Sequence, residues 1–195
     1  MRILFLLLLV SSSLLAVAQP QVRPTAHYLA GAVTERNGMV VFEQKFPVAQ
    51  RSRAQIYERL QQLVHQLVEV KDKLPHSRIT ELSPDSGTIA ASVEEYIWFK
   101  RNAFVWDRAV MRYQLVFNIV DEAFTATMRN IRYDYESIQG TGVDSNYKAE
   151  DWITDRAALT SKGKKLTRVG GRKFRVRTID RKDDIFAAAA LAATQ

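Results

Sequence analysis

The segment Ala109–Val120 places its largest apolar side chains at every second position. One face carries Ala109, Met111, Tyr113, Leu115, Phe117 and Ile119, and the other carries Arg112, Gln114 and Asn118. This period of two predicts a β-strand with one buried face. Asp121-Glu122 then predicts a two-residue turn, and Ala123–Tyr135 predicts the returning strand. A hairpin of this length needs a second layer over its apolar face, so we expect an antiparallel sheet covered on one side.

Three more strands and one helix are predicted before this hairpin. The strands are Met39–Phe46, Arg78–Leu82 and Thr88–Lys100. The helix covers about Arg53–Lys71, because its apolar residues recur every three or four positions: Ile56, Leu60, Leu63, Leu67 and Val70. Ser52 and Gln55 have the spacing of a capping box at its start. The predicted order is therefore β-α-β-β-β-β, which places the chain in the α+β class.

The C-terminal part, residues 137–195, changes in character. A glycine-containing loop comes first, and Trp152 and Ile153 then provide an apolar anchor back to the sheet. A helix is predicted over about Lys173–Ala193, whose alanine-rich end has high helix propensity. Phe174–Ile179 also alternates, so a short strand is the competing prediction there. We expect a loosely held arm at 19–37, an α+β domain at 38–136, and residues 137–195 as a loop and basic helical segment completing that domain.

Residues 1–18 have the form of a cleaved secretory signal. Arg2 precedes the apolar run Ile3–Val10, and Ala16-Val17-Ala18 supplies the small-x-small pattern of a cleavage site. The run is shorter than the about 20 apolar residues that a membrane-spanning helix needs. We therefore expect cleavage after Ala18 and a periplasmic or extracellular mature chain without a transmembrane segment. The chain has no cysteine, so it has no disulfide, no lipid-anchored cysteine and no thiolate chemistry.

The positive charge of the chain is concentrated near its C-terminus. Ten of the 28 basic residues but only three of the 21 acidic residues lie in 162–195, which accounts for the whole net charge of +7. The candidate anion-binding residues are Lys162, Lys164, Lys165, Arg168, Arg172, Lys173, Arg175 and Arg177. We favour the interpretation of a solvated helix face, and contact with anionic lipid or polysaccharide of the cell envelope is the functional alternative. The export signal argues against nucleic acid as the partner.

Two aromatic residues, Tyr96 and Trp98, fall on the polar face of the predicted strand Thr88–Lys100. Exposed aromatic side chains on a sheet face indicate a platform that binds carbohydrate or protein. Trp106 lies close by in the sequence and could extend this platform. The alternative is that the C-terminal helix covers the two rings through Phe174 or Phe186.

No catalytic, metal-binding or cofactor motif is present in the sequence. His27, His65 and His76 have no spacing that suits a metal site. Glu95 is unusual, because the period of two places it among apolar neighbours. We expect a strand-edge bulge that turns Glu95 outward rather than a buried catalytic carboxylate. We therefore assign no catalytic residue, no metal and no cofactor.

Several short runs together resemble one known family. They are Gly38–Phe42, Ile56–Arg59, Ser86–Ile89, and the hairpin at Asp121-Glu122 that closes on Ile131–Tyr133. Over about Gly38 to Tyr135 the chain resembles an uncharacterised bacterial secreted domain of unknown function with a TATA-binding-protein-like (TBP-like) fold. The resemblance implies one curved antiparallel sheet with helices on one face. The family often turns its hairpin with Asp-Gly, whereas this chain has Glu122 in the glycine position. The resemblance implies no activity, because fold does not determine function.

The sequence as a whole favours an exported, non-catalytic binding or structural module of the bacterial cell envelope. One alternative is a peripheral protein that docks on an anionic membrane surface through its basic C-terminal segment. The other is an envelope enzyme without a recognisable motif. This hypothesis would be supported if Glu95 converged with another ionisable group in a pocket.

Overall fold

One antiparallel sheet organises the computed structural model, which describes residues 23–69, 74–101, 106–135 and 146–195. Within these residues the strands are β1 (Glu35–Arg36), β2 (Met39–Pro47), β3 (Arg78–Ser83), β4 (Thr88–Arg101), β5 (Trp106–Val120), β6 (Ala123–Asp134) and β7 (Asn146–Lys148). They lie in the order β1-β2-β6-β5-β4-β3, and β7 also pairs with β6. The leader, with the predicted cleavage site at Ala18, lies outside the described residues.

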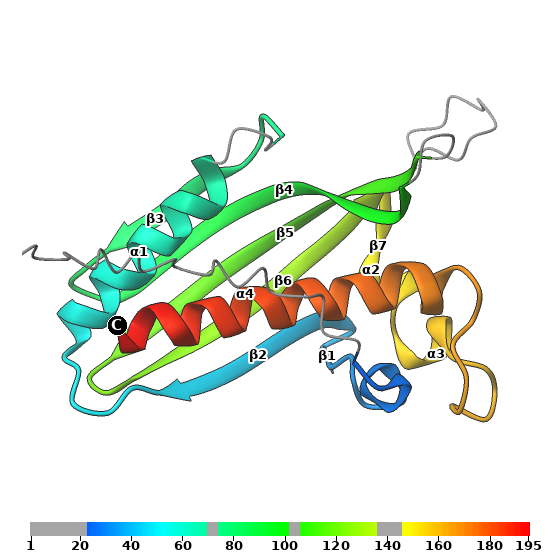
Figure 1. Cartoon of the computed structure of the whole chain (residues 1–195), viewed down its shortest axis with the longest axis horizontal. Coiled ribbons are helices and arrows are strands. Elements are labelled where there is room, and N and C mark those ends of the chain that lie inside the picture. The colour runs from blue at the N-terminus through cyan, green and yellow to red at the C-terminus, as the bar shows by residue number, and fades with distance from the viewer. Residues whose placement is uncertain (1–22, 70–73, 102–105, 136–145) are drawn as a thin grey trace, which may run out of the picture.

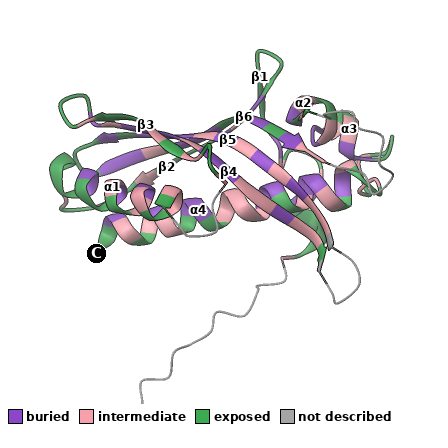
Figure 2. Cartoon of the chain, turned by 90° about the horizontal axis from the view of Figure 1, so that it is seen from above, coloured by how far each residue is buried: buried purple, intermediate pink, exposed green. Residues whose placement is uncertain are grey.

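Two long helices, α1 (Arg53–Glu69) and α4 (Val176–Thr194), lie side by side on one face of this bent sheet (Figures 1 and 2). The predicted β-α-β-β-β-β order and the α+β class are confirmed. The shorter elements are η1 (Thr25–Tyr28), α2 (Ala149–Trp152), α3 (Asp155–Ala158) and η2 (Gly170–Arg175). Phe174–Ile179 is helical, so the competing strand prediction is wrong. Phe174 and Thr178 are both buried, and both a helix and a strand would place them on one side. The helix also allows Thr178 Oγ1 to donate a hydrogen bond to the Phe174 carbonyl at 2.8 Å, which a strand would not.

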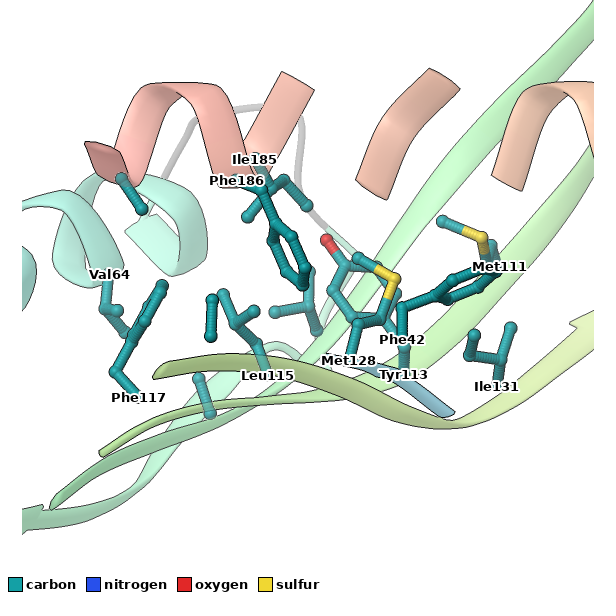
Figure 3. Close-up of a cluster of buried hydrophobic side chains, with 14 of the residues drawn as sticks. Phe42, Val64, Met111, Tyr113, Leu115, Phe117, Met128, Ile131, Ile185 and Phe186 are labelled. Atoms are coloured by element: carbon teal, nitrogen blue, oxygen red, sulfur yellow. The ribbon is translucent and has the colours of Figure 1, made fainter. Parts of the chain in front are cut away.

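The hydrophobic core lies between the sheet and the two helices (Figure 3). The sheet contributes large side chains from three strands: Phe42, Met111, Tyr113, Leu115, Phe117, Met128 and Ile131. The helices contribute Val64, Ile185 and Phe186. The face of β5 that the sequence pattern predicts to be apolar is therefore the buried face, and its residues are at most 2% exposed. No helix in the described part of the chain is long and apolar enough to cross a membrane.

The start of α1 and the β5–β6 turn hold each other in place. The predicted capping box forms, since the Ser52 amide donates to Gln55 Oε1 at 2.9 Å. Asp121 accepts a hydrogen bond from the Arg53 amide at 2.8 Å. Glu122 takes a left-handed φ of 56°, and its carboxylate accepts the Gln50 amide at 3.1 Å. Glu122 thus stands in the glycine position and supplies a contact that glycine lacks.

The arm at 23–37 is packed rather than loosely held. Tyr28 and Val33 are buried at 8% and 6% exposure. The Tyr28 hydroxyl donates to Asp180 on α4 at 2.7 Å, and burial with this carboxylate raises the pKa of Tyr28 to about 12. Arg23 also pairs with Asp180 at 2.7 Å. The prediction of a loose arm is wrong, because the arm packs on the acidic face of α4. This contact does not follow from the prolines and polar residues of the arm alone.

Candidate functional site

Tyr96, Trp98 and Arg108 form a cluster on the sheet face opposite α1 and α4. We call this face the open face and the three residues the aromatic cluster. The two ring centroids are 6.1 Å apart, and both rings are half-buried. The Arg108 guanidinium lies 3.9 Å from the centroid of Tyr96 and 5.2 Å from that of Trp98. Cross-strand register explains the contact, since Arg108 on β5 is the partner of Trp98 on β4.

The C-terminal helical segment does not cover this cluster. Phe174 packs on the other side of the sheet, with ring centroids 4.8 Å from Phe99 and 4.9 Å from Tyr133. Phe186 packs against Phe46 at 6.1 Å. The alternative in which Phe174 or Phe186 covers Tyr96 and Trp98 is therefore wrong. The side chain of Trp106 lies outside the described part.

A row of charged residues crosses the open face beside the aromatic cluster. Strand pairing places Glu94, Arg112, Arg132 and Lys148 next to one another on β4, β5, β6 and β7. Arg112 binds Glu94 at 2.6 Å and also pairs with Asp134. Glu94 is 3% exposed and also accepts a hydrogen bond from the His76 amide at 3.3 Å. One end of the row is thus a satisfied ion-pair network.

The other end of the row opens into a depression of about 390 Å³. Its lining residues come from the β1–β2 turn, β2, β6, β7, α2 and α3: Gly38, Met39, Asn130, Ile131, Arg132, Lys148, Glu150, Asp151 and Arg156. Glu150 is partly engaged there, because it accepts a hydrogen bond from the Val40 amide at 2.7 Å. Arg132, Lys148 and Arg156 are exposed, and none of them has an ion pair among the described residues.

The structure divides the basic C-terminal segment into two parts. Arg175 is fully buried and donates to the carbonyls of Tyr28, Ile153 and Leu29 at 2.6–2.7 Å, and to Asp155 at 2.7 Å. Including Arg175 in an anion-binding surface is therefore wrong, because no approaching ligand reaches its guanidinium. Lys173 is half-buried and pairs with Asp107 at 2.5 Å.

The remaining cations of the segment are exposed. Arg177 lies near Asp180 at 4.0 Å. We call the other five, Lys162, Lys164, Lys165, Arg168 and Arg172, the basic loop. Their side chains have no ion pair in the part of the chain that the structure describes. Leu159 and Leu166 pair as an isolated β-bridge, so the lysines lie on a short hairpin.

Glu95 faces the helices, so the prediction of an outward bulge is wrong. It pairs in regular register with Met111, and Arg181 on α4 binds both of its oxygens at 2.8 and 2.9 Å. The Tyr113 hydroxyl donates to Glu95 at 2.8 Å, and burial together with this carboxylate raises the pKa of Tyr113 well above its usual value. Glu95 therefore joins β4 to α4. Its carboxylate is committed to this contact.

The three histidines make ordinary structural contacts. His27 lies 2.6 Å from Asp183, and His65 lies 3.1 Å from Glu69 one helical turn away. His76 contributes its backbone amide to Glu94. In residues 23–69, 74–101, 106–135 and 146–195, no group of three or more His, Asp or Glu is placed to hold a metal ion.

Comparison with known proteins places this architecture in a family. Residues 42–134 match the model of a domain of unknown function with TBP-like fold, DUF4468. The crystal structure of a DUF4468 family protein from Bacteroides ovatus is similar at 34% identity and a TM-score of 0.79, covering 89% of this chain and 96% of that chain. The chain belongs to the DUF4468 family. The resemblance found in the sequence and the TBP-like fold are thereby confirmed. The similarity also extends well beyond residues 42–134.

A second solved structure supports the fold alone. A TBP-like protein from Parabacteroides distasonis is 18% identical with a TM-score of 0.66, covering 83% of this chain and 97% of that chain. No curated protein matches the chain significantly. The fold alone does not determine the function.

Tyr96 and Trp98 could be selected from the sequence because they are aromatic at polar positions of a strand. Arg108 and the Arg132–Lys148 pair were not predicted from the sequence as site residues. Their relevance depends on register between strands, which one sequence does not reveal. The Asn37-Gly38 pair, where both residues take left-handed φ values, was a usable signal for the β1–β2 hairpin beside the depression.

Proposed function

We propose that this protein is a non-catalytic binding module of the bacterial cell envelope and that it contacts its ligand through the aromatic cluster. The observation that carries the proposal is the packing of the Arg108 guanidinium over the rings of Tyr96 and Trp98 on the open face. Trp, Tyr and Arg are the residues that most often dominate binding energy at interfaces. Their planar groups offer flat apolar faces together with hydrogen-bond donors, which suits a sugar ring or a protein loop.

The envelope location rests on the signal-like residues 1–18. In this proposal, cleavage after Ala18 releases a mature chain that begins at Gln19 and stays in the periplasm or outside the cell. Arg23 forms an ion pair with Asp180 on α4, and it follows the predicted cleavage site by only a few residues. The proposal is therefore checked first by the N-terminal residue of the exported protein, measured by mass spectrometry.

The binding role is tested by co-sedimentation of the mature chain with isolated envelope polysaccharide. Trp98→Ala is expected to weaken binding about tenfold, since one buried aromatic contact contributes on the order of 1.4 kcal/mol or more. Leu191→Ala is the matched control, because Leu191 is an exposed apolar residue, 62% accessible, on α4. Equal binding by both variants and the unchanged chain contradicts the proposal.

A second candidate function is docking on an anionic membrane through the basic loop. The favouring observation is that these five cations are exposed and unpaired within the described residues, whereas Lys173 and Arg175 beside them are used internally. Each basic residue near an anionic leaflet contributes about 1 kcal/mol, and salt screens this attraction. Vesicles containing phosphatidylglycerol are expected to bind the mature chain at low salt and release it at high salt. Absence of binding at low salt removes this candidate.

A further inference from the structure

We propose that the depression at Arg132, Lys148 and Arg156 is an anion-binding site, and that it receives the carboxylate or phosphate group of an acidic polysaccharide. This inference deepens the proposed function, on which it rests, by naming the ligand class for the open face. It adds a second contact point beside the aromatic cluster.

Like charges are placed unfavourably on the strands beside the depression. Arg112, Arg132 and Lys148 are direct neighbours across β5, β6 and β7. Like charges directly opposite each other on neighbouring strands destabilise a sheet. Arg112 is neutralised by Glu94 and Asp134, but Arg132 and Lys148 have no acidic partner among the described residues. A bound anion would relieve the repulsion between these two side chains.

Three cations from separate elements converge on the depression. Arg132 comes from β6, Lys148 from β7 and Arg156 from α3, and all three line one depression. Two carboxylates also line it. Glu150 already accepts the Val40 amide at 2.7 Å, and Asp151 is exposed. Three cations and two carboxylates therefore line the depression, and one of the carboxylates already accepts a hydrogen bond. The depression has an excess of positive charge. Arginine suits this role because its planar donors match carboxylate and phosphate oxygens.

The charged row is continuous with the aromatic cluster. Tyr96, Val110 and Asp134 are paired one row along from Glu94, Arg112 and Arg132 on the same face. Neighbouring strands lie about 4.8 Å apart, so the row from Glu94 to Lys148 spans roughly 14 Å. One chain of a few sugars covers that distance. A sugar ring can stack on the aromatic cluster while an acidic substituent reaches Arg132 and Lys148.

The test uses the mature chain, residues 19–195, with polygalacturonate as the carboxylate probe and neutral dextran as its uncharged counterpart. The double variant Arg132→Gln/Lys148→Gln is expected to bind polygalacturonate at least about tenfold more weakly, since charge-assisted hydrogen bonds are lost. The matched control Lys45→Gln/Arg59→Gln removes the same charge at two exposed cations outside both the depression and the basic loop, and it is expected to bind within about twofold of the unchanged chain. Urea unfolding curves of both variants check that the fold is retained.

Equal weakening by the two double variants, or no binding of polygalacturonate, overturns the inference. Vesicles with phosphatidylglycerol serve as a further arm, and binding to them alone identifies a lipid headgroup and overturns the polysaccharide assignment. If Arg132→Gln/Lys148→Gln weakens binding but Trp98→Ala does not, the anion site stands and the role of the aromatic cluster fails. The reverse result retains the proposed function and removes the anion site.

Discussion

Arg175 and Arg177 are two positions apart, yet the fold uses them in opposite ways. Arg175 is fully buried with its guanidinium bound to three carbonyls and Asp155, whereas the side chain of Arg177 is 48% exposed. The sequence counts both as equal positive charges. Neither composition nor spacing could separate them, because the acceptors around Arg175 come from the arm and from the α2–α3 region.

Replacing Arg175 with Leu is expected to lower the free energy of unfolding by about 3–5 kcal/mol, because it leaves the Asp155 charge and buried carbonyls without their donor. Arg177→Leu is the control and is expected to change it by less than about 0.5 kcal/mol. Urea unfolding followed by circular dichroism measures both. Similar small losses of unfolding free energy in the two variants would contradict a stabilising role of the Arg175 side chain.

Glu95 illustrates the same limit of sequence reasoning. Its position among apolar residues correctly marked it as unusual, but the period of two could not identify Arg181, which lies 86 positions away in the chain. A bulge would have turned the Glu95 carboxylate towards solvent. In the structure the carboxylate stays among apolar residues, because Arg181 on α4 binds it. Residues with strong local patterns are thus predictable, while buried charges depend on distant contacts.

At the scale of elements, long periodic segments were predicted well and short ones were missed. The strands β2 to β6 and the helices α1 and α4 follow from alternation, helical spacing and turn residues. The short elements η1, β1, β7, α2 and α3 have two to four residues each, too few for any period to emerge. These elements nevertheless build the depression and hold Arg175.

The turn between β3 and β4 contains Gly87, a position where a side chain would collide with the backbone of β5. Gly87 has a φ of +71°, and a Cβ added there would lie 2.2 Å from the Ile119 carbonyl oxygen on β5. Gly87→Ala is therefore expected to cost at least about 2 kcal/mol of unfolding free energy. Gly38→Ala has the same kind of φ, +76°, but no atom within 4 Å, so about 1 kcal/mol is expected. Thermal and urea unfolding compare the two, and equal losses would contradict the close approach at Gly87.

At the scale of the whole molecule, the arm and the C-terminal helix are joined through acidic residues of α4. Burial opposes the charge of Asp183, but hydrogen bonds from Lys182 and His27 outweigh it and lower the pKa of Asp183. A carboxylate with a lowered pKa stabilises the fold above its unfolded pKa of about 3.9, and this stabilisation is lost as the pH falls through the folded value. Asp183→Asn is expected to be less stable than the unchanged chain at pH 6, with the difference shrinking towards pH 3. A constant difference across this range, measured by urea unfolding, would contradict the contribution of the Asp183 charge.

In our proposal the open face binds ligand, while the opposite face serves the fold. Side-chain NMR signals measure this most directly, because the indole N–H of Trp98 and the Nε–H of Arg132 report the open face, and the Nε–H of Arg181 reports the buried contact with Glu95. On titration with polygalacturonate we expect the Trp98 and Arg132 signals to shift together with one apparent Kd, while the Arg181 signal stays in place. Shifts confined to other side chains, with Trp98 and Arg132 unchanged at saturation, would contradict the claim.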